Sequence, residues 1–260
     1  MCKKCGHKHS QIRKDFSRTC NLCSHTESAG AGTSFHKVKF GLKKAFFICF
    51  EMATTTKSLS GSYTAKRFSV QENTARLFMH KVRDAMKSSE DYPMTGTVHV
   101  DGFVVGGYEE GKPGRSYDSS KKKAVCAVEL TEKGKVKRFY SSKIPDYSAK
   151  SLKEIFEKHI DKNAEVTTCS CKGYKPLCKE YNITQILSSK GANFKALHTT
   201  IHQVKSWLRA TYSWVGEKHI KRYLDEYCYR INRSQIKHSV FDNLIKRIIK
   251  SAHISAHIDK

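Results

Sequence analysis

The stretch Val98-His99-Val100-Asp101-Gly102-Phe103-Val104-Val105-Gly106-Gly107 decides the fold. Its β-branched and aromatic residues predict a buried strand that ends at paired glycines. Burying the carboxylate of Asp101 costs free energy unless a cation lies beside it. Asp101 is therefore either a strand-end carboxylate paired with a neighbouring Lys or Arg, or the first ligand of a catalytic divalent metal ion.

The charge of the chain indicates a polyanionic partner. Its 260 residues include 48 Lys and Arg against 24 Asp and Glu, a net charge of +24 that is spread along the whole chain. Such an excess attracts nucleic acid most strongly, and a merely basic protein or a binder of anionic lipid is the alternative. No apolar run has membrane-spanning length, and the residues after Met1 show no signal-peptide pattern. We predict a cytosolic protein whose ten cysteines do not pair as disulfides.

Residues 1–30 are predicted to form a zinc ribbon. Cys2 and Cys5 form one Cys-x-x-Cys pair, and Cys20 and Cys23 form another after fourteen intervening residues. Each pair presents two thiolates, and four thiolates complete a closed, tetrahedral zinc site. A redox dithiol is the alternative. A ribbon this small needs its metal in order to fold.

Residues 37–90 are predicted to contain a helix-turn-helix. Ser60 caps a helix that ends at Phe68, and a second helix spans residues 71–86 after the turn. Their shared core is expected to consist of Ala65, Phe68, Val70, Ala75, Leu77, Phe78 and Val82. Basic and amide side chains on the outer face suit the major groove, and we place Lys66, Arg67, Asn73, Arg76, His80, Lys81 and Arg83 there. Of these, Arg76, Lys81 and Arg83 are the predicted DNA contacts. An ordinary helical hairpin with a solvated basic face is the alternative.

Residues 95–250 combine strands and helices. The pattern predicts strands over about 97–105, 124–130, 136–140, 166–169 and 183–187. It predicts helices over about 149–160, 194–209, 217–231 and 240–249. Three strands followed by alternating helices and strands indicate a mixed α/β sheet with a helical C-terminal part. The whole chain is therefore predicted to be a multidomain α+β protein.

Several short motifs occur together along the chain. They are Thr74-Ala75-Arg76, Val100-Asp101, Val105-Gly106-Gly107, Gly114-Arg115, Gly173-Tyr174, the stretch 201–209 and Tyr229-Arg230-Ile231-Asn232-Arg233. In these motifs the sequence resembles the DDE transposases of bacterial insertion sequences, the ISXO2-like or IS1595 group, over nearly its whole length. The resemblance implies an RNase H-like catalytic domain in which acidic residues hold two metal ions, Mg²⁺ or Mn²⁺, for DNA cleavage and joining.

The resemblance places Asp101 at the first acidic position, but the sequence departs at the second. The family has a Thr-Asp pair shortly before Gly-Tyr, whereas this chain has Thr168-Cys169 before Gly173-Tyr174. A thiol is a poor ligand for Mg²⁺. The residue after the first Asp is commonly Glu in the family and is Gly102 here. These departures suggest a degenerate copy.

The third position varies in the family among Glu, Asn and His, with a Lys following it. His198, His202 and Lys205 recur at spacings of four and three, so they share one helix face. We predict His202 at the third position, with His198 as the alternative and Lys205 against phosphate. A basic surface helix without metal contact is the other interpretation. Arg115 and Arg209 are further predicted DNA contacts.

Three functional hypotheses stay open. The chain is a transposase that binds terminal repeats and cuts and joins DNA, or an inactive relative that only binds DNA, or a zinc-ribbon transcription regulator without an RNase H-like sheet around Asp101. A second zinc site at Cys169, Cys171 and Cys178 is disfavoured, because the spacing is unusual and a fourth ligand is not evident. The resemblance also implies a homo-oligomer on DNA and a place at the bacterial nucleoid in the cytoplasm.

Overall fold

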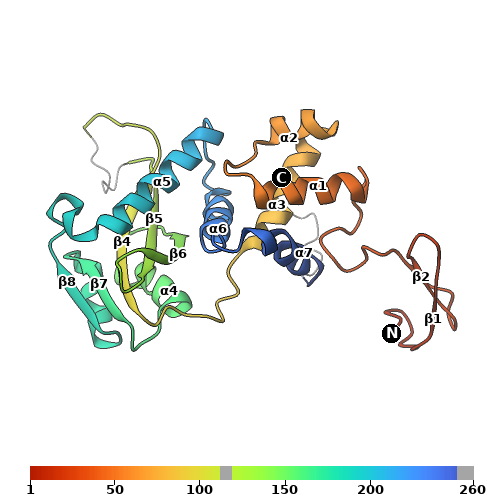
Figure 1. The fold of residues 1–260 in the computed structure, drawn as a ribbon, viewed down its shortest axis with the longest axis horizontal. Helices are drawn as coiled ribbons and strands as arrows, with labels where there is room; N and C mark the ends of the chain where they lie inside the picture. The colour runs from red at the N-terminus through yellow and green to blue at the C-terminus, as the bar shows by residue number, and fades with distance from the viewer. Residues whose placement is uncertain (112–118, 251–260) are drawn as a thin grey trace. The chain divides into compact units, whose positions relative to one another are not determined.

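The computed structural model describes residues 1–111 and 119–250 (Figure 1). Contacts between residues divide them into two compact units. The first, called the N-terminal unit here, contains Met1–Thr54, Gly61–Ala85 and the helix from Phe241 onward. The second, called the sheet unit, contains Thr55–Ser60 and Met86–Val240. The helix that the sequence assigned to the end of the third domain thus groups with the first unit, and the domain limits remain predictions.

The N-terminal unit begins with a small antiparallel sheet. It consists of β1 (Ser10–Ile12), β2 (Arg18–Cys20) and β3 (Thr26–Glu27) in the order β1-β2-β3. Within residues 1–27 only Ser17 and Cys20 are buried. This segment therefore has no hydrophobic core, so its order must depend on something other than apolar burial.

Helices make up the rest of the N-terminal unit. They are α1 (Leu42–Thr54), α2 (Gly61–Phe68), α3 (Glu72–Met86) and α7 (Val240–Lys250). The two predicted helices of the helix-turn-helix are confirmed as helices, and Ser69 between them has a positive φ of 49°. The prediction that Leu77 belongs to the core was wrong, because this residue of α3 is 46% exposed.

The sheet unit contains a mixed five-stranded sheet, as predicted. The order is β6-β5-β4-β7-β8, with β4 (Thr97–Val105) at the centre. One side of β4 carries antiparallel β5 (Lys122–Leu130) and β6 (Val136–Lys143). The other side carries parallel β7 (Glu165–Cys169) and β8 (Ile183–Ile186).

Helices cover both faces of this sheet (Figure 1). On one face, α4 (Ala149–His159) packs with Val98 and Val100 of β4. On the other, α5 (Lys195–Thr211) and α6 (Ile220–Ile231) pack with Phe103 and Val105. Since successive strand residues point to opposite faces, Asp101 shares the face of Phe103 and lies beneath α5. Short 3₁₀ helices occupy Lys172–Lys179, Ser189–Phe194 and Lys237–Ser239.

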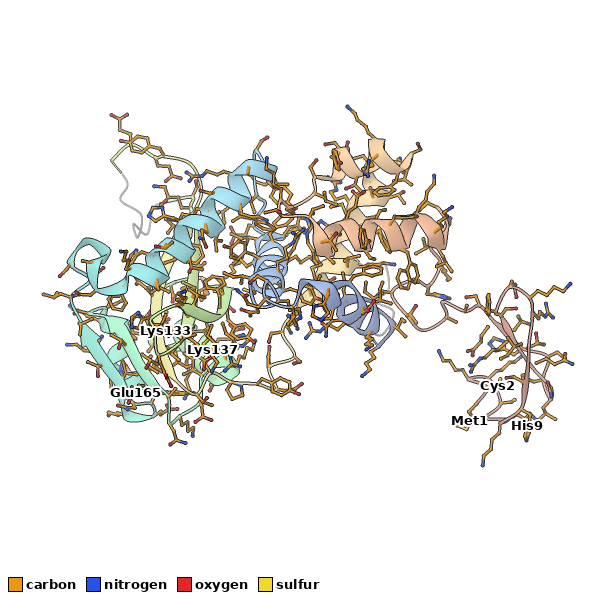
Figure 2. The ribbon with its side chains drawn as sticks, in the orientation of Figure 1. Met1, Cys2, His9, Lys133, Lys137 and Glu165 are labelled. Carbon is orange, nitrogen blue, oxygen red and sulfur yellow. The ribbon has the colours of Figure 1, made fainter. Side chains whose placement is uncertain are left out.

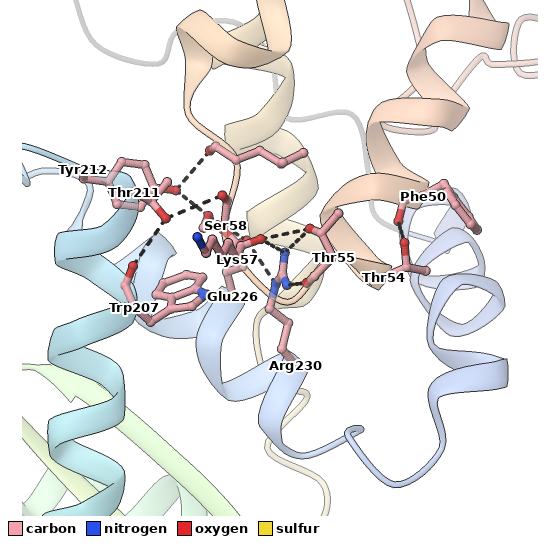
Figure 3. Close-up of polar contacts among 11 residues, drawn as sticks. Phe50, Thr54, Thr55, Lys57, Ser58, Trp207, Thr211, Tyr212, Glu226 and Arg230 are labelled. Atoms are coloured by element: carbon pink, nitrogen blue, oxygen red, sulfur yellow. Dashed lines mark hydrogen bonds and ion pairs between the residues drawn. The ribbon is translucent and has the colours of Figure 1, made fainter. Parts of the chain in front are cut away.

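The motif Tyr229–Arg233 has a structural role at the end of α6. Asn232 bonds both main-chain groups of Phe139 on β6, accepting from its N–H at 2.7 Å and donating to its C=O at 2.9 Å. Arg230 donates to the main-chain oxygens of Thr55 and Lys57 (Figure 3). The motif therefore ties α6 to the sheet edge and to the segment Thr55–Ser60.

A buried polar cluster supports the same segment (Figure 3). The hydroxyl of Ser58 donates to the fully buried carboxylate of Glu226 at 3.0 Å and lies 2.6 Å from the hydroxyl of Tyr212. Arg230 Nε lies 3.2 Å from the same carboxylate. This cluster fixes the position of Tyr212, the residue that follows α5. Among the described residues, no helix is both long and apolar enough to span a membrane.

Candidate functional site

The four cysteines of the ribbon come together as predicted. The sulfur atoms of Cys2, Cys5, Cys20 and Cys23 all lie within 4.8 Å of one another. The pair Cys2 and Cys23 is separated by 3.7 Å and the pair Cys5 and Cys20 by 3.6 Å. A tetrahedral zinc ion with bonds of about 2.3 Å separates its sulfurs by about 3.8 Å. The residues present therefore fit a closed structural site.

The thiols of the ribbon differ in pKa, and the pKa of Cys5 is raised to about 12, with the side-chain hydrogen bond of Cys23 as the largest cause that raises it. The backbone N–H of Cys23 is the largest cause that lowers the pKa of the Cys20 thiol, to about 6. A thiolate is the form that binds zinc. Within residues 1–111 and 119–250, no other group of three or more His, Cys, Asp or Glu side chains is close enough to share one ion.

Asp101 lies at the centre of the sheet, and its side chain is 4% exposed. Its main chain pairs with Cys126 on β5, whose thiol donates to the Asp101 main-chain oxygen at 3.5 Å. The N–H of Gly102 donates to Oδ1 at 2.7 Å. The other carboxylate oxygen, Oδ2, lies 3.7 Å from Nε2 of His198.

His198 is held in place by the chain that precedes it. Gly191, with φ of +93°, lets the backbone pass so close that a Cβ there would lie 3.3 Å from the imidazole. The ring of Phe194 packs at the side, with its centroid 6.4 Å away. Nε2 of His198 is buried, and no described residue hydrogen-bonds to it. Gly191 and Phe194 thus pack against the imidazole, which faces Asp101.

The other predicted residues of this helix lie farther from Asp101. His202, one turn along α5, is exposed. Lys205 is half-buried with Nζ 5.9 Å from the ring centroid of Phe103. Burial, followed by the positive charges of Arg209 and Lys121, lowers the pKa of Lys205. The structure therefore brings His198, and not His202, beside Asp101, while the catalytic roles assigned to these residues remain predictions.

Cys169 ends β7 beside the same part of the sheet. The parallel register pairs Val100 with Thr168, so Cys169 is level with Asp101. Its side chain is buried in the apolar cluster beneath α4. The amide of Gln185 donates to its main-chain oxygen at 3.3 Å. The two positions are level on neighbouring strands, but the Cys169 thiol is buried in the cluster beneath α4, whereas the Asp101 carboxylate faces His198 on α5.

These donors do not fit a pair of Mg²⁺ ions. Mg²⁺ requires hard oxygen ligands in octahedral geometry. Among the described residues, the groups that contact Asp101 include the imidazole of His198 and the thiol of Cys126, and no group of three His, Cys, Asp or Glu side chains there is close enough to share one ion. Soft sulfur and nitrogen donors select other metals.

Gly102, where the family commonly has Glu, is required by Tyr147. A Cβ on Gly102 would overlap the aromatic ring and lie 2.9 Å from its Cδ1. The Tyr147 hydroxyl donates to the main-chain oxygen of Phe103 at 2.9 Å. Gly173 lies against the main chain of Tyr147, and a Cβ on Gly173 would overlap the Tyr147 carbonyl oxygen. Sequence reasoning missed Tyr147, although two glycines in separate motifs are a signal of close backbone approach.

The predicted DNA contacts of α3 have different surroundings. Arg76 is exposed and donates to Asn73 at 2.7 Å, and Lys81 is half-buried. Placing His80 and Arg83 on the outer face was wrong, because each is 2% exposed. Arg83 lies one turn from both Met79 and Met86, so it shares their buried face. Arg83 is therefore not available as a surface contact.

A cavity of about 720 Å³ opens where β4 ends. It is bounded by the strand end and following loop, by the start of β5, and by the end of α5 with the loop after it. Its cations are Lys121, Lys122, Lys205 and Arg209. Of the predicted site residues, Lys205 and the exposed Arg209 are brought here, and Arg115 lies outside the described residues. Trp214 also lines this cavity, and sequence reasoning did not predict it as a site residue.

The structure combines a four-cysteine cluster that could hold a metal ion with a mixed α/β sheet unit. The family model described as the ISXO2-like transposase domain matches residues 93–232. This is more than half of the chain, and the chain belongs to that family. The match includes Asp101, Cys169 and His198.

Other comparisons add little. A search of curated proteins found no match. One similar solved structure is a crystal structure of the Mos1 mariner paired end complex with Mn, which is 10% identical over 74% of each chain. The TM-score of 0.23 is too low for an argument about this chain.

Proposed function

We propose that this chain is a DNA-binding member of the transposase family that no longer cleaves DNA strands with a divalent metal. Membership of the family and the net charge of +24 support DNA binding. The observation that carries the loss of cleavage is the residue level with Asp101 on the neighbouring strand, which is a cysteine with its thiol buried in the cluster beneath α4, not a carboxylate. Without a second carboxylate, two hard cations lack the further oxygen ligands that would hold both of them at Asp101.

The sheet unit is proposed to be RNase H-like. The order β6-β5-β4-β7-β8, with antiparallel pairs on one side of β4 and parallel pairs on the other, supports this assignment. The regulator hypothesis expected no RNase H-like sheet around Asp101, and the mixed five-stranded sheet at that position counts against it.

Recognition of the element ends is assigned to the zinc ribbon, residues 1–30, and to the helix-turn-helix within 37–90. Four cysteines that fit one zinc ion support a structural role for the ribbon. Arg76 and Lys81 on α3 are the proposed contacts to DNA. A homo-oligomer on DNA and a location at the bacterial nucleoid are further proposals, drawn from the family alone.

DNA binding can be tested by fluorescence anisotropy with a labelled blunt duplex across a range of salt concentrations. Replacing Arg76 and Lys81 by Ala should weaken binding and make the slope of log K against log salt shallower by about two. The matched control replaces Lys133 and Lys135, exposed in the β5–β6 turn, by Ala (Lys133 is labelled in Figure 2). This control also removes two charges and should retain native affinity. Equal losses in both variants would refute the assignment to α3.

A second candidate function is an active transposase. The observation in its favour is the imidazole of His198 at 3.7 Å from Asp101, with Nε2 unbonded among the described residues. The imidazole group is a better ligand for transition metal ions than for Mg²⁺. The two candidates agree on DNA binding and differ in whether the native chain cleaves strands.

A further inference from the structure

The cavity at the end of β4 is strongly basic. Lys121, Lys122, Lys205 and Arg209 line it, and Glu109 is the one carboxylate among its described lining residues. Ser119 and Ser120 donate hydroxyl hydrogen bonds to that carboxylate, which partly satisfies its charge. An excess of cations in a concave surface concentrates a polyanion. The cavity therefore attracts phosphate, which by itself does not distinguish a duplex from a single strand.

Trp214 gives the cavity a second feature. Its indole ring is 75% exposed, although it is among the largest apolar side chains. Lys122 Nζ lies 5.3 Å from the ring centroid. Gly216 backs the six-membered ring so closely that a Cβ there would lie 3.1 Å from it. The indole is thus supported by its neighbours while most of its surface stays open.

The segment that carries Trp214 starts from a fixed point. The N–H of Tyr212 bonds the Leu208 carbonyl at 2.9 Å as α5 ends. Its ring packs on Tyr223 with centroids 4.3 Å apart, and its hydroxyl meets Ser58 (Figure 3). Trp214 therefore follows two residues after an anchored tyrosine, beside the basic wall of the cavity.

These features favour an unpaired nucleotide over a duplex. Bases inside a duplex are covered by their neighbours, whereas an unpaired base has a free face for an aromatic ring. Stacking on aromatic side chains within a positively charged groove is how proteins hold single strands. A volume of about 720 Å³ also falls in the range of sites for small ligands, about 300–1,000 Å³.

We propose that this cavity binds an unpaired nucleotide of a DNA strand, with the base stacked on Trp214 and the phosphates held by Lys121, Lys122, Lys205 and Arg209. The inference rests on the proposed DNA-binding function. The cavity lies on the path of the central strand, since Val105 is four residues beyond Asp101, roughly 13 Å at about 3.3 Å per residue.

The test compares two single-stranded probes with equal charge. One is a labelled thymidine oligomer, and the other is an abasic oligomer of the same length, so their difference in affinity measures the contribution of the bases. The full chain should prefer the thymidine oligomer roughly tenfold, and Trp214→Ala should remove that preference. Trp214→Phe should keep part of it. Tyr92→Ala, which truncates another aromatic residue that is 75% exposed, should keep all of it.

A direct signal comes from tryptophan emission, because the chain has two Trp residues. In a Trp207→Phe background, thymidine oligomers should quench the emission of Trp214 and abasic oligomers should not. A preference for bases that survives in Trp214→Ala, or equal affinity of the native chain for both probes, would overturn the inference while duplex binding stands. A native chain that binds neither these probes nor a duplex would overturn the proposed function itself. Circular dichroism of each variant establishes that it is folded.

Discussion

At the scale of single residues, Asp101 and Cys169 define what the sheet unit can do. They are level on neighbouring strands, yet only one of them can act as a hard oxygen ligand. The sequence predicted the position of both, because a motif fixes the residue and its place on a strand. It did not predict the contact between Asp101 and His198, since the choice between two histidines one turn apart depends on how α5 lies on the sheet.

Gly102 provides a test at this scale. Gly102→Ala should lower the free energy of unfolding by about 1–3 kcal/mol, because the added methyl group overlaps the ring of Tyr147. Chemical denaturation with urea measures the change. The control is Gly107→Ala, where no atom lies within 4 Å of the added Cβ.

Removing the ring should also remove the penalty. In a Tyr147→Ala background, Gly102→Ala is expected to be nearly neutral, so the pair should show strong coupling in a double-mutant cycle. Independent, additive effects would mean that Tyr147 is not the reason for glycine at this position.

At the scale of elements, local periodicity predicted most helices and strands. The predicted strand 97–105 coincides with β4, and the predicted helices 71–86 and 149–160 correspond closely to α3 and α4. Periodicity predicted less reliably which side chains of a helix are buried and which are exposed. His80 and Arg83 carry polar groups, but α3 is packed on more than one side, so both are buried. Whether such a polar side chain is buried depends on packing against residues that are distant in the sequence.

The end of α4 gives a prediction about pH. His159 is 6% exposed and stacks on Tyr140 with ring centroids 4.1 Å apart. Burial, and then the charges of Lys158 and Lys221, lower its pKa to about 4, against about 6.5 in an unfolded chain. Above pH 6.5 both states are neutral. As the pH falls from 6.5 to 4, only the unfolded chain gains the proton, so stability falls, in total by roughly 3 kcal/mol.

This pH dependence should be lost when the imidazole is replaced. His159→Phe keeps an aromatic ring against Tyr140 and cannot be protonated. Urea unfolding of the native chain and the variant is monitored by circular dichroism at several pH values between 4 and 7. The comparison gives the difference in how the free energy of unfolding depends on pH. If the two chains lose stability in parallel, His159 is not the group that titrates.

At the scale of the whole molecule, residues 1–27 and the sheet unit depend on different sources of stability. The ribbon has no apolar core, while the sheet has clusters on both faces. The cysteine spacing was sufficient to predict that the four cysteines come together, since two Cys-x-x-Cys pairs need little further information. The cavity with Trp214 was not predictable, because it forms where the ends of three separate segments meet.

Removal of zinc should therefore affect one part of the chain. A strong chelator is expected to release one zinc ion per chain and to abolish the dispersed amide resonances of residues 1–27, while those of the sheet persist. Nuclear magnetic resonance of the full chain resolves the two sets. Cys20→Ser should reproduce the effect without chelator, whereas Cys178→Ser, at an exposed cysteine outside the cluster, should not. Simultaneous loss of both sets of resonances would contradict the prediction that the sheet stays folded without zinc.

The most direct test of the whole account is a strand-cleavage assay on supercoiled plasmid with Mg²⁺ or Mn²⁺. The native chain, Asp101→Asn and Cys169→Asp are compared at protein concentrations at which anisotropy shows that DNA is bound. We predict that the native chain binds DNA and nicks it no more than Asp101→Asn does, and that Cys169→Asp is the one variant able to gain cleavage. Metal-dependent nicking by the native chain that disappears in Asp101→Asn would contradict the account and establish an active transposase.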